Sequence, residues 1–138
     1  MKKIISLLFY NAIKNKAPLL VGAFSTVIGV TIFMRYNQLQ THLPPALDWA
    51  DDFIPGVIYT MVGLFTMFDA LTETGDVYVR YALYIVNACM FAVLTASYAL
   101  DGTLSHHVSM YPFTYGILFI FDLMLCYELP GIKQLKRR

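Results

Sequence analysis

A chain of 138 residues that is 58% hydrophobic and only 14% charged has too few polar side chains to cover a water-soluble core. With a mean hydropathy of +0.59, the composition excludes an ordinary soluble domain and predicts a protein covered by lipid. The net charge of +1 hides a separation, because most basic residues gather toward the two ends: Lys2, Lys3, Lys14 and Lys16 at one, and Lys133, Lys136, Arg137 and Arg138 at the other.

Residues 1–16 are predicted to form a short amphipathic helix. Its apolar core is too short for a secretory signal and no small-residue cleavage site follows, so we expect the segment to be retained. One interpretation is an interfacial helix lying on anionic lipid, and the alternative is a basic lead-in to the first membrane span. On a helix the residues separate onto two faces: Ile4, Ile5, Leu8, Phe9, Ala12 and Ile13 on one, and Lys3, Tyr10, Asn11 and Lys14 on the other.

The first membrane span is predicted over residues 18–35. At ~1.5 Å per residue its apolar run covers ~25 Å of a ~30 Å hydrocarbon core, and Arg35 can reach the interface to complete the crossing. Small residues recur at positions i, i+3, i+4 and i+7, which keeps bulk off one side and favours close packing against another helix backbone. These residues are Gly22, Ser25, Thr26 and Gly29.

The second span is predicted over residues 53–70. A polar loop precedes it, in which Trp49 is expected to lie at the level of the lipid headgroups. Asp69, near the end of the span, is expected to be hydrated or to pair with Arg80. A second stripe of small residues lies within the span: Gly56, Thr60 and Gly63.

The third span is predicted over residues 77–100, with Arg80 as an interface anchor at its start. Asp101 and Gly102 are expected to end the helix, and a short loop follows. Asn87 is a polar residue inside the span. Beside it runs a third stripe of small residues with a spacing of four: Ala88, Ala92 and Ala96.

The fourth span is predicted over residues 108–129, before a basic tail at 130–138, and it contains the carboxylate of Asp122. Antiparallel packing would place Asp122 and Asn87 at one depth, so they are predicted partners. A charged Asp near a span centre costs about 2.5–3.5 kcal/mol, whereas one interhelical hydrogen bond returns about 0.6 kcal/mol. Three roles remain for Asp122: a neutral side chain bonded to Asn87 or to the first span, a proton- or ion-handling group, or a contact with a cation of another subunit.

The distribution of Lys and Arg predicts the topology. With both termini in the cytoplasm, nine of the ten basic residues lie inside or at the inner interface, and only Arg35 lies outside. We therefore predict an all-α polytopic membrane protein. Its four transmembrane helices form an antiparallel bundle in a single domain, N-in and C-in, most simply in a bacterial inner membrane.

The sequence contains no pattern that predicts catalysis. His42, His106 and His107 all fall on the outer side, without the spacing of a zinc or haem site, so no metal and no cofactor is expected. The thiols of Cys89 and Cys126 lie inside apolar runs and are expected to be buried hydrophobic groups. Aromatic residues are not interleaved with exposed cations, which argues against nucleic-acid binding. We expect a protein that is not an enzyme.

Two classes of function remain. The first is a small non-catalytic membrane subunit that packs through its glycine and alanine faces to scaffold or complete a larger assembly, respiratory, secretory or viral, or that associates with itself. The second is a pore or a small ion- or proton-coupled transporter that uses Asp122 and Asn87. In size, hydrophobicity and a short basic tail, residues 133–138, the chain resembles phage holins, which implies pore formation in a membrane.

Overall fold

The computed structural model describes residues 2–38, 52–73, 76–105 and 110–128, and the side chains of 2–4, 35–38 and 105 lie outside that description. Five helices make up this part of the chain, which contains no strand, in agreement with the all-α prediction. The helices are α1 (Lys2–Lys14), α2 (Lys16–Gln38), α3 (Phe53–Thr72), α4 (Val77–Ser105) and α5 (Tyr111–Glu128).

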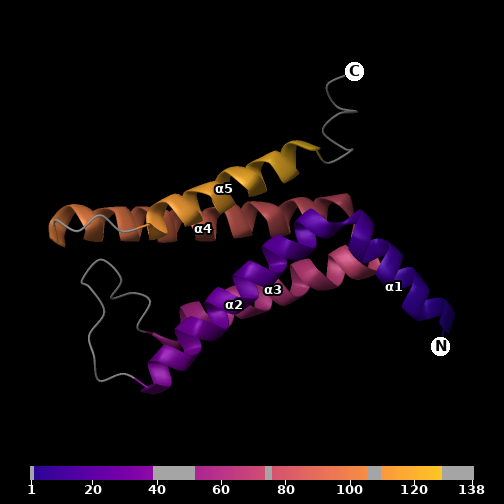
Figure 1. The fold of residues 1–138 in the computed structure, drawn as a ribbon, viewed down its shortest axis with the longest axis horizontal. Helices are drawn as coiled ribbons and strands as arrows, with labels where there is room; N and C mark the ends of the chain where they lie inside the picture. The colour runs from indigo at the N-terminus through magenta and orange to yellow at the C-terminus, as the bar shows by residue number, and fades with distance from the viewer. Residues whose placement is uncertain (1, 39–51, 74–75, 106–109, 129–138) are drawn as a thin grey trace.

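The first two helices are separated by a break at Asn15. Pro18 has no amide hydrogen to donate to the carbonyl four residues earlier, and its ring crowds that carbonyl, so one continuous helix is disfavoured here. Backbone bonds from Asn15 N to Asn11 O (2.8 Å) and from Leu19 N to Asn15 O (3.1 Å) keep the break tight. The chain therefore changes direction within one residue, and α1 leaves the bundle at the N-terminal end of α2 (Figure 1).

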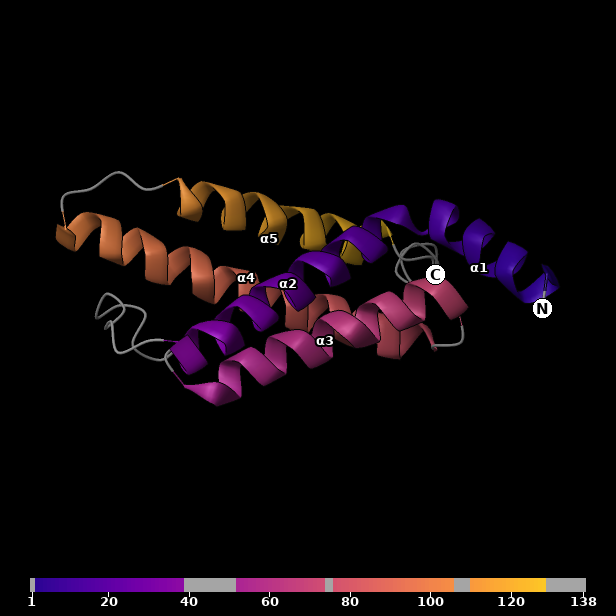
Figure 2. The same cartoon turned by 60° about the horizontal axis from the view of Figure 1, so that its bottom comes forward.

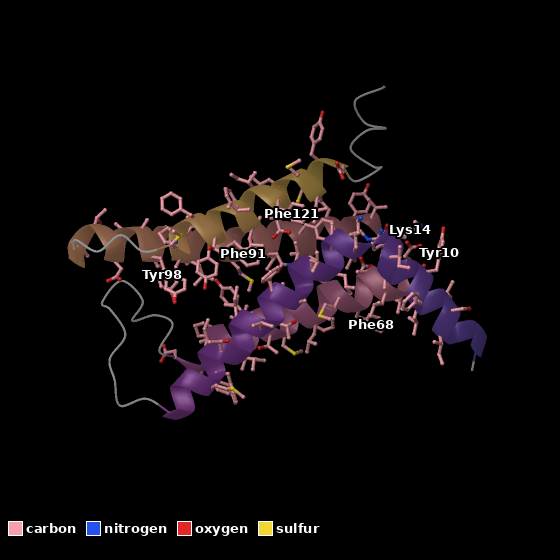
Figure 3. The ribbon with its side chains drawn as sticks, viewed as in Figure 1. Tyr10, Lys14, Phe68, Phe91, Tyr98 and Phe121 are labelled. Carbon is pink, nitrogen blue, oxygen red and sulfur yellow. The ribbon has the colours of Figure 1, made fainter. Side chains whose placement is uncertain are left out.

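The four longer helices form two antiparallel pairs, α2 with α3 and α4 with α5. Figures 1 and 2 show that the pairs cross: they lie against each other near the N-terminal ends of α2 and α4 and diverge toward the C-terminal ends of these helices. A core of Tyr59, Met90 and Leu94 joins the pairs, with Ile28 and Tyr115 packed against it. Phe91, fully buried, lies on the side of α4 that faces α2 (Figure 3).

The outer surface of the helices is apolar. Large hydrophobic side chains stand exposed along all five, including Phe24 on α2, Phe65 on α3, Val93 on α4 and Ile120 on α5. In the described part of the chain three helices are long and apolar enough to cross a membrane, over Lys16–Met34, Phe53–Thr72 and Val77–Leu104, and these candidate spans coincide with the first three of the four predicted ones. Helix α5, with 18 residues that include Asp122 and Glu128, is not among the three.

The end of α4 differs from the prediction. The helix does not stop at Asp101 and Gly102 but continues to Ser105, 29 residues in all. A single glycine costs a helix only about 1 kcal/mol relative to alanine, which the preceding turns can absorb. The hydroxyl of Thr103 also donates to the carbonyl of Leu100 at 2.7 Å, which satisfies an acceptor in this last part of α4. At ~1.5 Å per residue, α4 is ~43 Å long and exceeds the ~30 Å thickness of a hydrocarbon core.

Candidate functional site

The small residues of the first two stripes meet between α2 and α3. A Cβ added at Gly63 would lie 2.5 Å from Thr26 N and 2.6 Å from Gly22 O, and one at Gly22 would lie 2.8 Å from Gly63 O. At the other end of the interface, a Cβ at Gly29 would lie 2.7 Å from Gly56 O and would also clash with Thr60. The two backbones are therefore in direct contact, and side chains larger than hydrogen cannot be accommodated at these positions.

Threonine completes this interface from each side. Thr26 on α2 packs over Gly63, and Thr60 on α3 packs over Gly29. Each hydroxyl donates to its own helix, Thr26 to Gly22 O and Thr60 to Gly56 O, both at 2.8 Å. Because the hydroxyls are bonded within their own helices, the interface needs no polar partner from the opposite helix.

Ser25, the remaining member of the first stripe, points elsewhere. Its hydroxyl donates to Asn87 Oδ1, and both residues are fully buried. Asn87 Nδ2 donates in turn to Thr66 Oγ1 at 2.9 Å and to Leu83 O at 3.0 Å. Ser25, Thr66 and Asn87 form a polar cluster that connects α2, α3 and α4, and Thr66 Oγ1 itself donates to Val62 O at 2.8 Å.

The alanine stripe of α4 does not act as one unit. Ala88 is buried, Ala92 is partly buried and Ala96 is exposed. The spacing of four residues advances slightly more than one helical turn, so the stripe drifts around the helix away from the bundle interior. The close approach between α4 and α5 involves other residues: a Cβ at Gly116 would meet Thr95 Cγ2 at 3.7 Å, an ordinary van der Waals distance.

Asp122 is fully buried, and neither of its carboxylate oxygens has a hydrogen-bond partner among the described residues. The predicted bond to Asn87 is absent there, and so is the predicted alternative of a bond to Ser25 or Thr26. The reason is geometric: the Asn87 amide is already engaged by Ser25, Thr66 and Leu83. Asn87 and Asp122 are predicted to lie at equal depth along the bundle, but equal depth does not require that two side chains point toward each other.

The register of α4 and α5 sets the level of Asp122 along the bundle. Tyr84 packs with Cys126 on one side of it, and Gly116 lies opposite Thr95 on the other, so Asp122 lies near the level of Ala88. An ionised carboxylate without a partner at such a position costs several kcal/mol, roughly the 2.5–3.5 kcal/mol of the insertion scale. The protonated acid avoids most of that cost, and Asp122 therefore has the chemistry of a proton-binding group.

Arg80, predicted as an anchor at the membrane interface, forms hydrogen bonds within the protein. Its guanidinium bonds Asp69 through Nε to Oδ2 at 2.7 Å and through Nη2 to Oδ1 at 3.3 Å. This bidentate ion pair joins the C-terminal end of α3 to the N-terminal end of α4. Of the two expectations for Asp69, pairing with Arg80 is the one that the structure shows.

Sequence reasoning missed a junction between α1 and the end of α3. Asn11 Nδ2 donates to Leu71 O at 2.8 Å, and Asn15 Nδ2 donates to Ala70 O at 3.0 Å and to Glu73 Oε1 at 2.7 Å. Lys14 Nζ lies 2.9 Å from the same carboxylate oxygen. The sequence does contain a signal for this junction: two asparagines lie four residues apart in a short segment that is otherwise apolar and basic. We call Asn11, Lys14, Asn15 and Glu73 the α1–α3 junction.

Glu73 occupies a special position in this junction. It follows α3 with a left-handed backbone, φ 51°, and its amide donates to Asp69 O at 2.9 Å, as a helix C-cap does. The hydrogen bonds from Asn15 and then from Lys14 hold the pKa of the Glu73 carboxyl below its ordinary value. The charged form of Glu73 is thus the one that holds α1.

A second missed contact supports the core. Tyr59 of α3 donates a hydrogen bond from its phenolic hydroxyl to the carbonyl of Met90 on α4 at 2.7 Å, so a buried polar atom again has its partner on another helix.

Of the two thiols, Cys126 is buried as expected, whereas Cys89 is exposed. Within the described ranges no group of three or more His, Cys, Asp or Glu residues is placed to hold a metal ion. Trp49, the tail 130–138 and the histidines (His42, His106 and His107) lie outside these ranges, as does the side chain of Arg35.

No protein-family model, curated protein or solved structure matches this chain.

Proposed function

We propose that this chain is a small non-catalytic integral membrane subunit that scaffolds or completes a larger membrane assembly. In this proposal α5 crosses the bilayer beside the three apolar helices, and both termini lie in the cytoplasm. The distribution of Lys and Arg along the sequence supports that orientation, because it assigns nine of the ten basic residues to the inner side or the inner interface. The apolar outer faces offer surfaces both to lipid and to neighbouring helices.

One observation carries the proposal: the side chains of the polar cluster form their hydrogen bonds with one another inside the bundle. Ser25, Thr66 and Asn87 bond to one another across three helices, and Tyr59 bonds to a backbone carbonyl. A conducting path needs polar groups at several depths that remain available to water or ions. In the described part of the chain, these groups instead hold helix to helix, as expected for a protein whose task is to pack.

A second candidate function rests on Asp122. A fully buried carboxylate without a partner in the described residues is costly, and such groups in membrane helices commonly mark proton or ion pathways. On this basis the alternative is a pore, holin-like or otherwise, or a small proton-coupled transporter. Asn87 then belongs to the polar cluster with Ser25 and Thr66 and is not the hydrogen-bond partner of Asp122.

A leak experiment separates the two candidates. The wild-type chain and an Asp122→Asn variant are produced at matched levels in bacterial inner membranes, and dye entry and membrane potential are followed. The subunit proposal predicts that neither chain depolarises the cells, because no path opens. Depolarisation by the wild type but not by the variant would overturn it and establish Asp122 as part of a conduction or transport pathway.

A size measurement tests the assembly itself. We expect the protein, extracted from its native membrane in mild detergent, to migrate well above the 15.7 kDa of one chain. The matched control is the same protein purified alone after overproduction, which distinguishes self-association from assembly with other subunits. A monomer in both preparations would contradict the proposal.

A further inference from the structure

Helix α1 is attached to the protein through the side that bears Asn11. The polar contacts come from Asn11, Lys14 and the following Asn15, and all end on residues 70–73, at the C-terminal end of α3 and its cap. Beyond this α1–α3 junction the helix extends past the end of α3 and away from the bundle (Figures 1 and 2). Tyr10 and Lys14 mark its course in Figure 3.

The opposite side of α1 is apolar and uncovered by the described chain. Ile5, Phe9 and Ile13 follow one another at a spacing of four residues and are 62%, 70% and 63% exposed. In a water-soluble protein an amphipathic helix packs its apolar stripe on the core and presents its polar side to solvent. In α1 the stripe of Ile5, Phe9 and Ile13 is instead exposed, so the medium that α1 meets is apolar on this side.

The charge of α1 indicates which apolar medium this is. The helix begins with Lys2 and Lys3, carries no acidic residue in its 13 positions, and is separated from Lys16 by Asn15 alone. Lys14 is occupied by Glu73, but the remaining lysines have no acidic neighbour within the helix. Apolar stripes flanked by lysine are suited to the boundary between acyl chains and negatively charged headgroups.

The position of α1 agrees with this boundary. It leaves the bundle where the apolar stretch of α3 ends at Thr72 and that of α4 begins at Val77, which is one edge of the candidate membrane spans. The junction with the α3 C-cap holds α1 at this level and sets which side faces outward. A helix anchored there by its polar side lies with its apolar side toward the hydrocarbon.

We propose that α1 is a binding site for acidic phospholipids, with Ile5, Phe9 and Ile13 among the acyl chains and the excess of basic residues in this segment of the sequence attracting the anionic headgroups. The α1–α3 junction holds only the C-terminal end of α1 and sets which side can face the lipid, so the lipid contact holds the part of the helix that extends beyond the junction. The inference is independent of the proposed subunit function, since it concerns only this helix and the lipid around it.

The first test compares two sides of α1 in the full-length protein. Trp49→Phe removes the single tryptophan, and Phe9→Trp or Leu7→Trp then places a reporter on the apolar side or on the side of Asn11. Both positions are exposed, 70% and 58%, so neither change disturbs packing, and circular dichroism verifies the helix content. In vesicles containing phosphatidylglycerol we expect the reporter at position 9 to be quenched by acyl-chain bromines and the reporter at position 7 by aqueous acrylamide.

The second test asks whether the lipid charge matters. The reporter at position 9 is measured in vesicles of phosphatidylcholine alone and of phosphatidylcholine with phosphatidylglycerol, with and without Lys2→Gln and Lys3→Gln. Each lysine near an anionic surface contributes roughly a fivefold change in binding, so the double variant should lower the ratio of protected to accessible reporter on the order of 25-fold. The same effect should weaken as salt is raised.

Three results would overturn the proposal. Equal acrylamide access at positions 7 and 9 would show that α1 stands in water. Protection at position 9 that is the same with and without phosphatidylglycerol would remove the acidic headgroup from the site. Protection in detergent that grows with protein concentration would show that a second copy of the chain, and not lipid, covers Ile5, Phe9 and Ile13.

Discussion

The two helix pairs are built by different means. Between α2 and α3 the backbones touch, since a Cβ at Gly63 would come within 2.6 Å of Gly22 O. Between α4 and α5 side chains fill the space: Tyr98 stacks on Tyr115 with ring centroids 5.5 Å apart, and a Cβ at Gly116 would find an ordinary contact at 3.7 Å. The first interface therefore tolerates almost no change in volume, whereas the second has room to adjust.

The pairs also differ in how their polar groups are satisfied. Thr26 and Thr60 in the first pair bond to their own helices, and Ser25 and Thr66 bond to the Asn87 amide that reaches across from α4. The second pair buries Asp122 with no partner among the described residues. The α2–α3 pair is therefore held by close backbone packing with its polar groups satisfied, while the α4–α5 pair contains the buried carboxyl group that lacks a described partner.

The largest effect is expected from one identical substitution made in each pair. Gly63→Ala forces the α2 and α3 backbones apart and should lower the free energy of unfolding by about 2–3 kcal/mol. Gly116→Ala, the matched control, should leave it unchanged or raise it by less than about 1 kcal/mol, because alanine favours the helix. SDS titration followed by circular dichroism measures both. Equal losses would contradict the distinction between the two interfaces.

Breaking the link between the pairs should have the next largest effect. Asn87→Leu removes the hydrogen bonds to Ser25 and Thr66, and at about 0.6 kcal/mol for each interhelical bond, with some reaching 1.7, the loss should be about 1–2 kcal/mol. Val86→Leu, at an exposed position next in sequence, serves as the control and should change little. If Asn87→Leu unfolds at the same SDS fraction as the wild type, the polar cluster does not stabilise the bundle.

A gain in stability is expected at Asp122. Replacing a buried polar side chain that lacks a partner with an apolar one removes its desolvation penalty, so Asp122→Leu should raise the free energy of unfolding by about 1 kcal/mol. Asp122→Asn keeps a polar side chain in the same place and should bring no such gain. A loss of stability on Asp122→Leu, in the same SDS titration, would mean that the carboxyl has a partner outside the described residues.

The smallest effect concerns the attachment of α1 at low pH. Because the pKa of Glu73 is lowered in the folded protein, its contribution is fully present above the ordinary value of 4.5 and is lost as the pH falls through the lowered one. Amide exchange in α1 should then quicken while exchange in α2 and α3 does not. Glu73→Gln should show the faster exchange already at neutral pH, and an α1 that stays equally protected in this variant would contradict the role of Glu73.

Much of the architecture follows from local sequence patterns. Long apolar runs bounded by charged or polar turns predicted an all-helical membrane protein, and the structure confirms all-helical organisation with three candidate spans. The i, i+3, i+4, i+7 spacing from Gly22 to Gly29 defines one side of a helix whatever that helix touches. Helix ends are less local: α4 passes through Asp101 and Gly102 because the weak preference of two residues does not stop a long helix.

Which polar groups meet depends on the packing of the helices. The sequence places Asn87 and Asp122 inside apolar helices and at matching depth, but depth leaves the rotation of each helix about its axis open. In the folded bundle that rotation turns Asn87 toward Ser25 and Thr66, and leaves Asp122 without a described partner. It also turns Asn11 and Asn15 inward, onto the end of α3. Side-chain direction depends on the packing of several helices at once, and no periodicity within a single helix contains that information.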